Sequence, residues 1–249
     1  MTAAKAERLQ KQDGCNGRAF AQIIRRKDIT MKVMILALKG FEMLEFSAFA
    51  DVLGWAKLEG GLDIEYDTAG FSREVQSTFD VPVRVDRVLW RRGAGVCCPV
   101  DICEGDYDAL AIPGGFEEYG YYEEAYRDET TMLIRAFHKA GKPIASICVG
   151  ALALGNSGVL EGRKATTYTP DGSNRQTPQR SHQQAPQLSY RQKQLAAFGA
   201  DVQAGERIVV DGNLITSCGP STATDVAFLL LQKLTDAESA EKVRKLMGF

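Results

Sequence analysis

One cysteine stands where an apolar stretch gives way to small residues. Residues 143–147 read as a buried strand, Cys148 follows, and residues 149–154 open an amphipathic helical pattern. This order predicts a sharp strand-to-helix turn, which presents a nucleophile at the edge of a sheet. Because the first N–H groups of a helix and its dipole favour negative charge, a thiol at this turn is expected to ionise readily and to be reactive.

A second interpretation of Cys148 stays open at this point. Free cysteine is among the most buried residue types, and an inert thiol in a parallel strand fits the same local sequence. The turn alone does not decide between the two, because a nucleophile is identified with the help of its partner groups.

The remaining thiols do not form a recognisable metal site. Cys97, Cys98 and Cys103 lie close together, but structural zinc needs four ligands in spaced pairs, and neither His138 nor His182 is in a ligand pattern. No predicted strand is followed by a phosphate-binding glycine motif. We therefore expect no metal and no cofactor, and we interpret residues 93–104 as a loop with incidental thiols.

Charge and composition limit the possible partners. The 249 residues carry a formal net charge of -2, and nucleic-acid and anionic-membrane binders usually show a basic patch instead. No apolar run approaches the roughly 20 residues that span a bilayer, and the amino terminus lacks the apolar core of a secretion signal. We expect a cytoplasmic protein whose partners are small molecules or its own subunits.

Strands and helices alternate along the chain and must position the cysteine. A continuous apolar strand at residues 32–38 is followed by a helix at residues 41–57. The other expected elements are strands at 63–69, 81–88, 107–112 and 163–168, helices at 123–140, 190–198, 221–234 and 238–247, and a hairpin over 207–217 that turns at an Asp-Gly pair.

This alternation predicts an α/β sandwich with a mostly parallel sheet, whose active edge lies at the carboxyl ends of the strands. Residues 40–45, residues 113–115 and Cys148 all fall at that edge, which favours the reactive interpretation of the thiol. We expect a single domain over residues 31–249, with a loosely ordered extension at residues 1–30 and a polar insertion at about 170–189.

Four motifs in this order resemble the DJ-1/PfpI (ThiJ) family. They are LKGFEMLE at residues 38–45, AIPGG at 111–115, ASICVG at 145–150 and LITS at 214–217. The resemblance runs from about residue 31 to the end and implies a flavodoxin-like three-layer sandwich, similar to the class I glutamine amidotransferases. It also implies a homodimer.

The resemblance assigns roles to several residues. It makes Cys148 the cysteine that a protonated Glu45 keeps ionised and oriented, and a second charge beside a thiolate would raise the pKa of that carboxyl. It also places an oxyanion-type pocket at the backbone of Gly114, Gly115 and Val149. The alternatives are a solvated carboxylate at the start of a helix for Glu45, and a plain turn at the end of a strand for the glycines.

The chain departs from the family where a histidine would be expected. Val149 follows the cysteine where peptidase-like members carry histidine, and Tyr168 follows the Thr-Thr strand where relatives of DJ-1 carry one. No general base is evident at either place, which makes a peptidase the weakest interpretation. Tyr168 and His182 are the possible auxiliary groups, although a phenol with an ordinary pKa near 10 is a poor base.

Three functions remain open. The first is a cysteine-dependent enzyme of hydrolase or lyase type, in which Cys148 attacks a small electrophile such as a glyoxal-like carbonyl or an isocyanide. The second is a redox-sensing or chaperone-like stress protein without turnover, in which an oxidant converts Cys148 to a sulfinate that Glu45 stabilises. The third is a ligand-binding sandwich without chemistry.

Overall fold

The computed structural model describes residues 30–89, 104–169 and 188–249. Three of the predictions lie wholly or largely outside these residues. They concern the N-terminal extension, the loop with three cysteines, and the polar insertion with His182.

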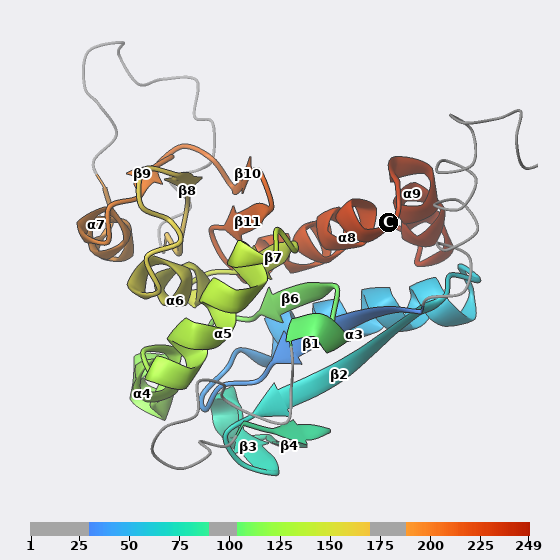
Figure 1. Cartoon of the computed structure of the whole chain (residues 1–249), viewed down its shortest axis with the longest axis horizontal. Helices are drawn as coiled ribbons and strands as arrows, with labels where there is room; N and C mark the ends of the chain where they lie inside the picture. Colours follow the sequence, from blue (N-terminus) through green and yellow to red (C-terminus); the bar gives the residue numbers. More distant parts are fainter. Residues whose placement is uncertain (1–29, 90–103, 170–187) are drawn as a thin grey trace, which may run out of the picture. The chain divides into compact units, whose positions relative to one another are not determined.

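A seven-stranded sheet with the order β10-β11-β7-β6-β1-β2-β5 runs through the chain from Met31 onward (Figure 1). All neighbouring pairs are parallel except β10 and β11. This arrangement confirms the predicted mostly parallel sheet. The strands are β1 Met31–Leu36, β2 Ile64–Gly70, β5 Arg87–Val88, β6 Ala109–Ile112, β7 Ile144–Ser146, β10 Ile208–Asp211 and β11 Leu214–Ser217.

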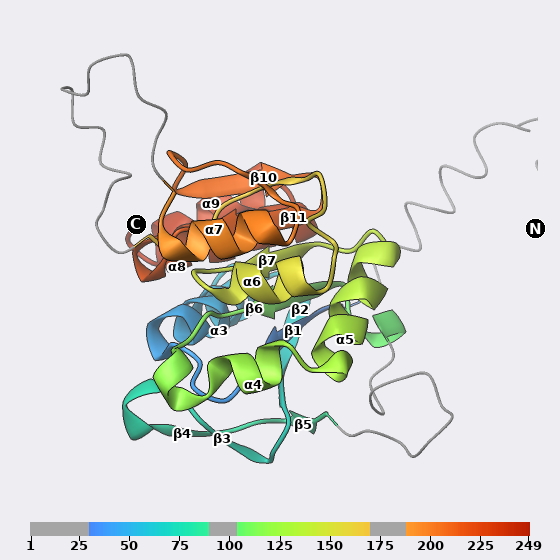
Figure 2. The same cartoon turned by 90° about the vertical axis from the view of Figure 1, so that its left-hand side faces the viewer.

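Helices cover both faces of this sheet, as predicted for a three-layer sandwich. On one face α3 Met43–Leu58, α8 Ala223–Leu234 and α9 Ala237–Leu246 contact one another. The other face, turned toward the viewer in Figure 2, carries α4 Tyr121–Ala125, α5 Asp128–Lys139, α6 Gly150–Asn156 and α7 Tyr190–Ala197. The short 3-10 turns are η1 Thr78–Asp80, η2 Glu104–Asp106, η3 Glu117–Tyr119 and η4 Pro220–Thr222.

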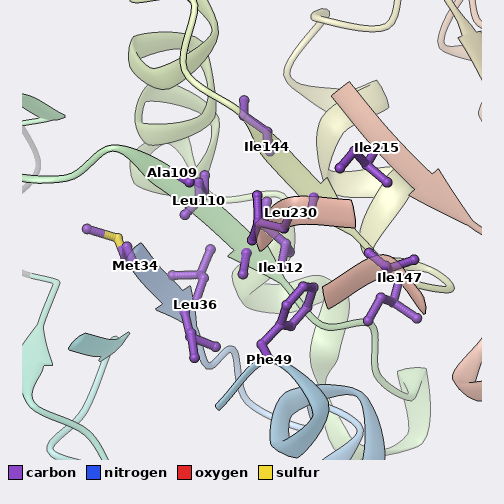
Figure 3. Packing of buried hydrophobic residues seen from close by; sticks show 14 of the residues in the cluster. Met34, Leu36, Phe49, Ala109, Leu110, Ile112, Ile144, Ile147, Ile215 and Leu230 are labelled. Atoms are coloured by element: carbon purple, nitrogen blue, oxygen red, sulfur yellow. The ribbon is translucent and has the colours of Figure 1, made fainter. Parts of the chain in front are cut away.

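β1 is an interior strand of the sheet, between β6 and β2. Its apolar residues from Val33 onward are fully buried, because both faces of the strand are covered. Figure 3 shows Met34 and Leu36 of β1 beside Leu110 and Ile112 of β6, with Phe49 of α3 packed against them. Burying a side chain of this size contributes roughly 1.5–3 kcal/mol.

The single strand predicted at residues 81–88 is wrong. β4 Pro82–Arg84 pairs with β3 Glu74–Gln76 in a separate hairpin, whereas β5 joins the edge of the main sheet. Asp86 fixes the break, because its Oδ2 accepts hydrogen bonds from the N–H and the hydroxyl of Thr68 at 2.9 and 2.8 Å. The strand therefore divides at a polar side chain that binds a neighbouring strand.

Two further elements are shorter than predicted. The helix expected at 123–140 is interrupted at Arg127, whose backbone is extended with ψ 150°, and the Thr130 hydroxyl donates across the break to the Glu124 carbonyl at 2.8 Å. The strand expected at 163–168 reduces to β8 Lys164–Ala165, which pairs with β9 Asp201–Val202 outside the main sheet. The hairpin at β10 and β11 is confirmed, with Gly212 at φ +59° in its turn.

In the part of the chain that the structure describes, no helix has the length and apolar character needed to cross a membrane.

Candidate active site

Cys148 lies at the turn between β7 and α6, as the sequence predicts. Its backbone has φ +56°, a left-handed conformation that is unusual for a residue with a side chain. Its N–H donates to the Ser217 carbonyl at 3.0 Å, which ties the turn to the end of β11. Such a conformation costs about 1–3 kcal/mol and is characteristic of functional sites. The side chain is 8% exposed.

Glycine at position 114 allows the neighbouring turn to approach the cysteine closely. A Cβ there would lie 2.9 Å from the Cβ of Cys148 and 2.9 Å from the backbone nitrogen of Val149. Any side chain would therefore displace the cysteine turn. The structure brings the second and third predicted features, residues 113–115 and Cys148, into direct contact.

Glu45 enters the same site from the first turn of α3. Its side chain is fully buried, and its Oε2 accepts a hydrogen bond from the Gly114 N–H at 2.6 Å. Its Oε1 is buried and is paired with no N–H or O–H group among the described residues, but the Cys148 thiol lies within hydrogen-bond reach of the carboxyl. Burial raises the pKa of Glu45 to about 8, against the opposing effect of the Gly114 N–H, and the nearby Glu42 raises it further. Glu45 is therefore mostly protonated at neutral pH.

Glu42, a second carboxylate near Glu45, has a structural role. It caps α3 by accepting from the Leu44 N–H at 3.4 Å, and it also accepts from the Thr78 hydroxyl at 3.3 Å. It directly precedes the helix. The solvated alternative considered for Glu45 is excluded, because Glu45 is the buried one of the two.

The surroundings of the thiol act against ionisation while Glu45 carries a charge. Burial raises the pKa of Cys148 above its usual value, and an ionised Glu45 raises it further, whereas the Val149 N–H lowers it. This direction is opposite to the one expected from the helix terminus alone. When Glu45 is protonated, this like charge is absent and no longer raises the pKa of the thiol. The protonation of each group thus changes the pKa of the other, and the two titrate as one coupled pair.

The three backbone N–H groups at this site differ in what they bind. The Gly114 N–H is taken by Glu45, so Gly114 is not a free oxyanion donor. The Val149 N–H points to the sulfur, and the Gly115 N–H makes no hydrogen bond within the described residues. Glycine is needed at 115, because a Cβ there would lie 2.3 Å from the Gly40 carbonyl oxygen and from the ring of Tyr121.

Of the two possible auxiliary groups, Tyr168 lies among the described residues and His182 does not. The side chain of Tyr168 is half-buried beside Gly219, and its carbonyl accepts from the Ser189 hydroxyl at 3.3 Å. The preceding residue does reach the cysteine, because the Thr167 hydroxyl donates to the Cys148 carbonyl at 2.8 Å. His182 lies outside the described residues.

The sequence analysis missed the tyrosines that follow the glycine turn. The hydroxyl of the fully buried Tyr121 donates to the Pro113 carbonyl at 2.7 Å. The ring of Tyr122 lies edge-on to the ring of Tyr121, and the two ring centroids are 5.6 Å apart. The guanidinium of Arg191 lies 4.9 Å from the centre of the Tyr122 ring. The signal that could have found them is an aromatic pair directly after a predicted active-site turn.

The family model for the DJ-1/PfpI family matches residues 31–233. The chain belongs to the DJ-1/PfpI family. The solved structure of Drosophila melanogaster DJ-1beta has a TM-score of 0.66 and 26% sequence identity to it, over 88% of this chain and 98% of that one.

Two curated proteins are similar to most or part of the chain. Protein DJ-1 homolog B of Arabidopsis thaliana is 26% identical over 229 residues, which are 92% of this chain and 44% of that protein. Isonitrile hydratase of Pseudomonas putida is 29% identical over 147 residues, 59% of this chain and 51% of that protein. The chain thus spans about half the length of these two relatives.

Within the described ranges, no three His, Cys, Asp or Glu side chains are grouped so that they could hold a metal ion.

Proposed function

We propose that this DJ-1/PfpI protein is a cysteine-dependent enzyme of hydrolase or lyase type that acts on a small electrophile, either a glyoxal-like carbonyl or an isocyanide. Cys148 is the nucleophile, Glu45 moves the proton, and the N–H groups of Gly115 and Val149 face the charge that develops. The observation that carries the proposal is the fully buried Glu45 carboxyl, whose pKa of about 8 suits proton transfer near neutral pH.

The pair reacts in the form that holds one proton. Because burial raises the pKa of Cys148, that proton rests mainly on the sulfur, and the reacting species is the minor form with a thiolate at Cys148 and a neutral Glu45. With an isocyanide, sulfur bonds to the terminal carbon and Glu45 supplies a proton to give a thioimidate. Water then adds to that carbon and the C–S bond breaks, which returns the thiolate. The net reaction adds one water and yields a formamide.

With a glyoxal, sulfur bonds to the aldehyde carbon and the oxygen takes the electron pair and a proton. The Glu45 carboxylate then removes the proton from that carbon and returns it to the neighbouring carbonyl carbon, while the proton on the first oxygen passes to the second. This internal transfer leaves a thioester, which water hydrolyses to a hydroxy acid. No external oxidant or reductant is consumed.

The relative from Pseudomonas putida supports the choice of substrates. Its name assigns it the hydration of an isonitrile, which is one of the two reactions above. A small substrate also suits the site, because the thiol is only 8% exposed.

Turnover measurements test the proposal directly. Methylglyoxal and a small alkyl isocyanide should each be tried as substrate, with product measured by chromatography. Activity that is lost in Cys148→Ala and reduced at least about 100-fold in Glu45→Gln supports the roles of both residues. The absence of turnover with both compounds contradicts the proposed enzyme.

Redox sensing is the alternative use of the same cysteine. A sulfinate at Cys148 would accept hydrogen bonds from a neutral Glu45, whose carboxyl lies within hydrogen-bond reach of the sulfur, and from the Val149 N–H. Intact-mass analysis after peroxide treatment separates the functions. A gain of two oxygens on Cys148 together with no turnover favours the sensor.

A homodimer working in the cytoplasm completes the proposal. Light scattering at micromolar concentration should give twice the mass of the 27.2 kDa chain, and a mass of one chain would contradict the dimer.

A further inference from the structure

Tyr122 carries a hydroxyl that is buried and that no described group hydrogen-bonds. Leaving a buried hydroxyl unpaired is unfavourable, because it loses its hydrogen bonds to water and gains none in the protein. The neighbouring Tyr121, by contrast, has its hydroxyl satisfied by the Pro113 carbonyl at 2.7 Å. A donor held without a partner inside the protein is available to a molecule that enters from outside.

The ring of Tyr122 is linked to the active-site turn through the ring of Tyr121. The ring of Tyr121 fills the space that glycine leaves at position 115, and it lies edge-on to the ring of Tyr122. The helix that carries both tyrosines, α4, contacts α6, which begins two residues after Cys148.

Its neighbours hold the Tyr122 ring in place. Tyr126 stacks on it with ring centroids 5.2 Å apart, and the Arg191 guanidinium lies 4.9 Å from its centre. Arg191 is in turn fixed by Glu117 at 2.9 Å and by Gln194 at 2.9 Å. Because hydrogen-bond catalysis depends on donors that are already positioned, this packing suits such a role.

We propose that the Tyr122 hydroxyl donates a hydrogen bond to the carbonyl oxygen that gains negative charge when Cys148 attacks a glyoxal-like substrate. It would act beside the N–H groups of Gly115 and Val149, and it would supply a side-chain donor in a site that lacks the family's histidines. This inference rests on the proposed function. Burial raises the pKa of Tyr122 well above its ordinary value, so the phenol stays protonated and serves as a donor, not as a base.

Two electrophiles that differ in where the charge goes provide the test. Iodoacetamide alkylates sulfur with loss of iodide and places no charge on a substrate heteroatom. Methylglyoxal adds through its carbonyl, whose oxygen takes the charge. The rate of Cys148 alkylation is followed by intact mass, and the rate of carbonyl addition by stopped-flow loss of the reactive thiol.

Tyr122→Phe should slow carbonyl addition by about 100-fold, as removal of an oxyanion donor does, and should change the alkylation rate by less than about 2-fold. Tyr126→Phe is the matched control, because it removes a hydroxyl from the ring that stacks on Tyr122. Both of its rates should stay within about 2-fold of those of the unchanged protein. Tyr122→Phe should also unfold at the same or a higher urea concentration, because the lost hydroxyl had no partner.

The assignment of Tyr122 is overturned if Tyr122→Phe alters both rates alike or neither rate. It is also overturned if methylglyoxal does not add to Cys148 of the unchanged protein, because the donor then has no charge to meet. If carbonyl addition slows selectively in Tyr122→Phe while the unchanged protein forms no product, the proposed turnover fails and the role of Tyr122 stands.

Discussion

The buried Glu45 makes the stability of the protein depend on pH in a way that can be calculated. Its pKa in the folded protein is about 8, against 4.5 for the ordinary carboxyl. Below pH 4.5 the carboxyl is neutral in both states and burial costs no charge. Between pH 4.5 and 8 the unfolded chain releases the proton and the folded chain keeps it, so the free energy of unfolding falls as the pH rises. Above pH 8 the loss is complete.

The size of this loss follows from the shift. Each unit of pKa difference corresponds to about 1.4 kcal/mol. The rise from 4.5 to about 8 in Glu45 therefore amounts to about 5 kcal/mol of stability lost across this pH range. Glu45→Gln keeps the shape of the neutral acid and does not ionise. We expect it to become more stable relative to Glu45 by about 1.4 kcal/mol per pH unit up to about pH 8.

The measurement uses a Cys148→Ser background, which removes the coupled thiol. Urea unfolding of this protein and of its Glu45→Gln derivative is measured at intervals from pH 5 to pH 9. Other titrating groups contribute equally to both proteins and cancel in the difference. A difference in unfolding free energy that stays constant from pH 5 to pH 8 would refute the reasoning, because Glu45 would then ionise in the fold as it does in water.

Three other outcomes follow from the same geometry. Gly114→Ala should lose about 1–3 kcal/mol of stability in urea unfolding, because its Cβ would lie 2.9 Å from the Cβ of Cys148. Gly54→Ala is the control, since a Cβ there meets nothing within 4 Å. This substitution should stabilise α3 by about 0.5–1 kcal/mol, and equal effects at positions 54 and 114 would contradict the close contact. Cys148→Gly should be more stable than Cys148→Ala by about 1 kcal/mol, because φ +56° strains any residue with a Cβ, and the reverse order in thermal unfolding would argue against strain. Asp86→Ala should cost about 1–3 kcal/mol in urea unfolding by leaving the Thr68 donors unpaired, and an unchanged midpoint would show that this turn does not depend on them.

The sequence determined the parts of the fold that depend on local pattern. The apolar run that became β1, the helix that became α3 and the Asp-Gly hairpin of β10 and β11 are each recognisable within a short window, because burial periodicity and turn chemistry act locally. The meeting of the glycine turn with Cys148 followed from the rule that parallel strands end at one edge of the sheet. The sequence analysis missed two interruptions of predicted elements. The interruption at Asp86 depends on a hydrogen bond to another strand, which no local pattern encodes. The interruption at Arg127 is a local change of backbone conformation that the helical pattern does not reveal.

Only the tertiary structure decided the chemical state of the site. Whether Glu45 or Glu42 is the buried carboxyl, and hence which pKa rises, depends on how α3 packs against the glycine turn. The direction of the shift at Cys148 also reversed once burial was known, because desolvation outweighs the helix terminus that the sequence reveals. The unpaired hydroxyl of Tyr122 is likewise a feature that only the tertiary structure reveals. Burial and partner groups are properties of the packed chain, because they are set by residues far apart in sequence.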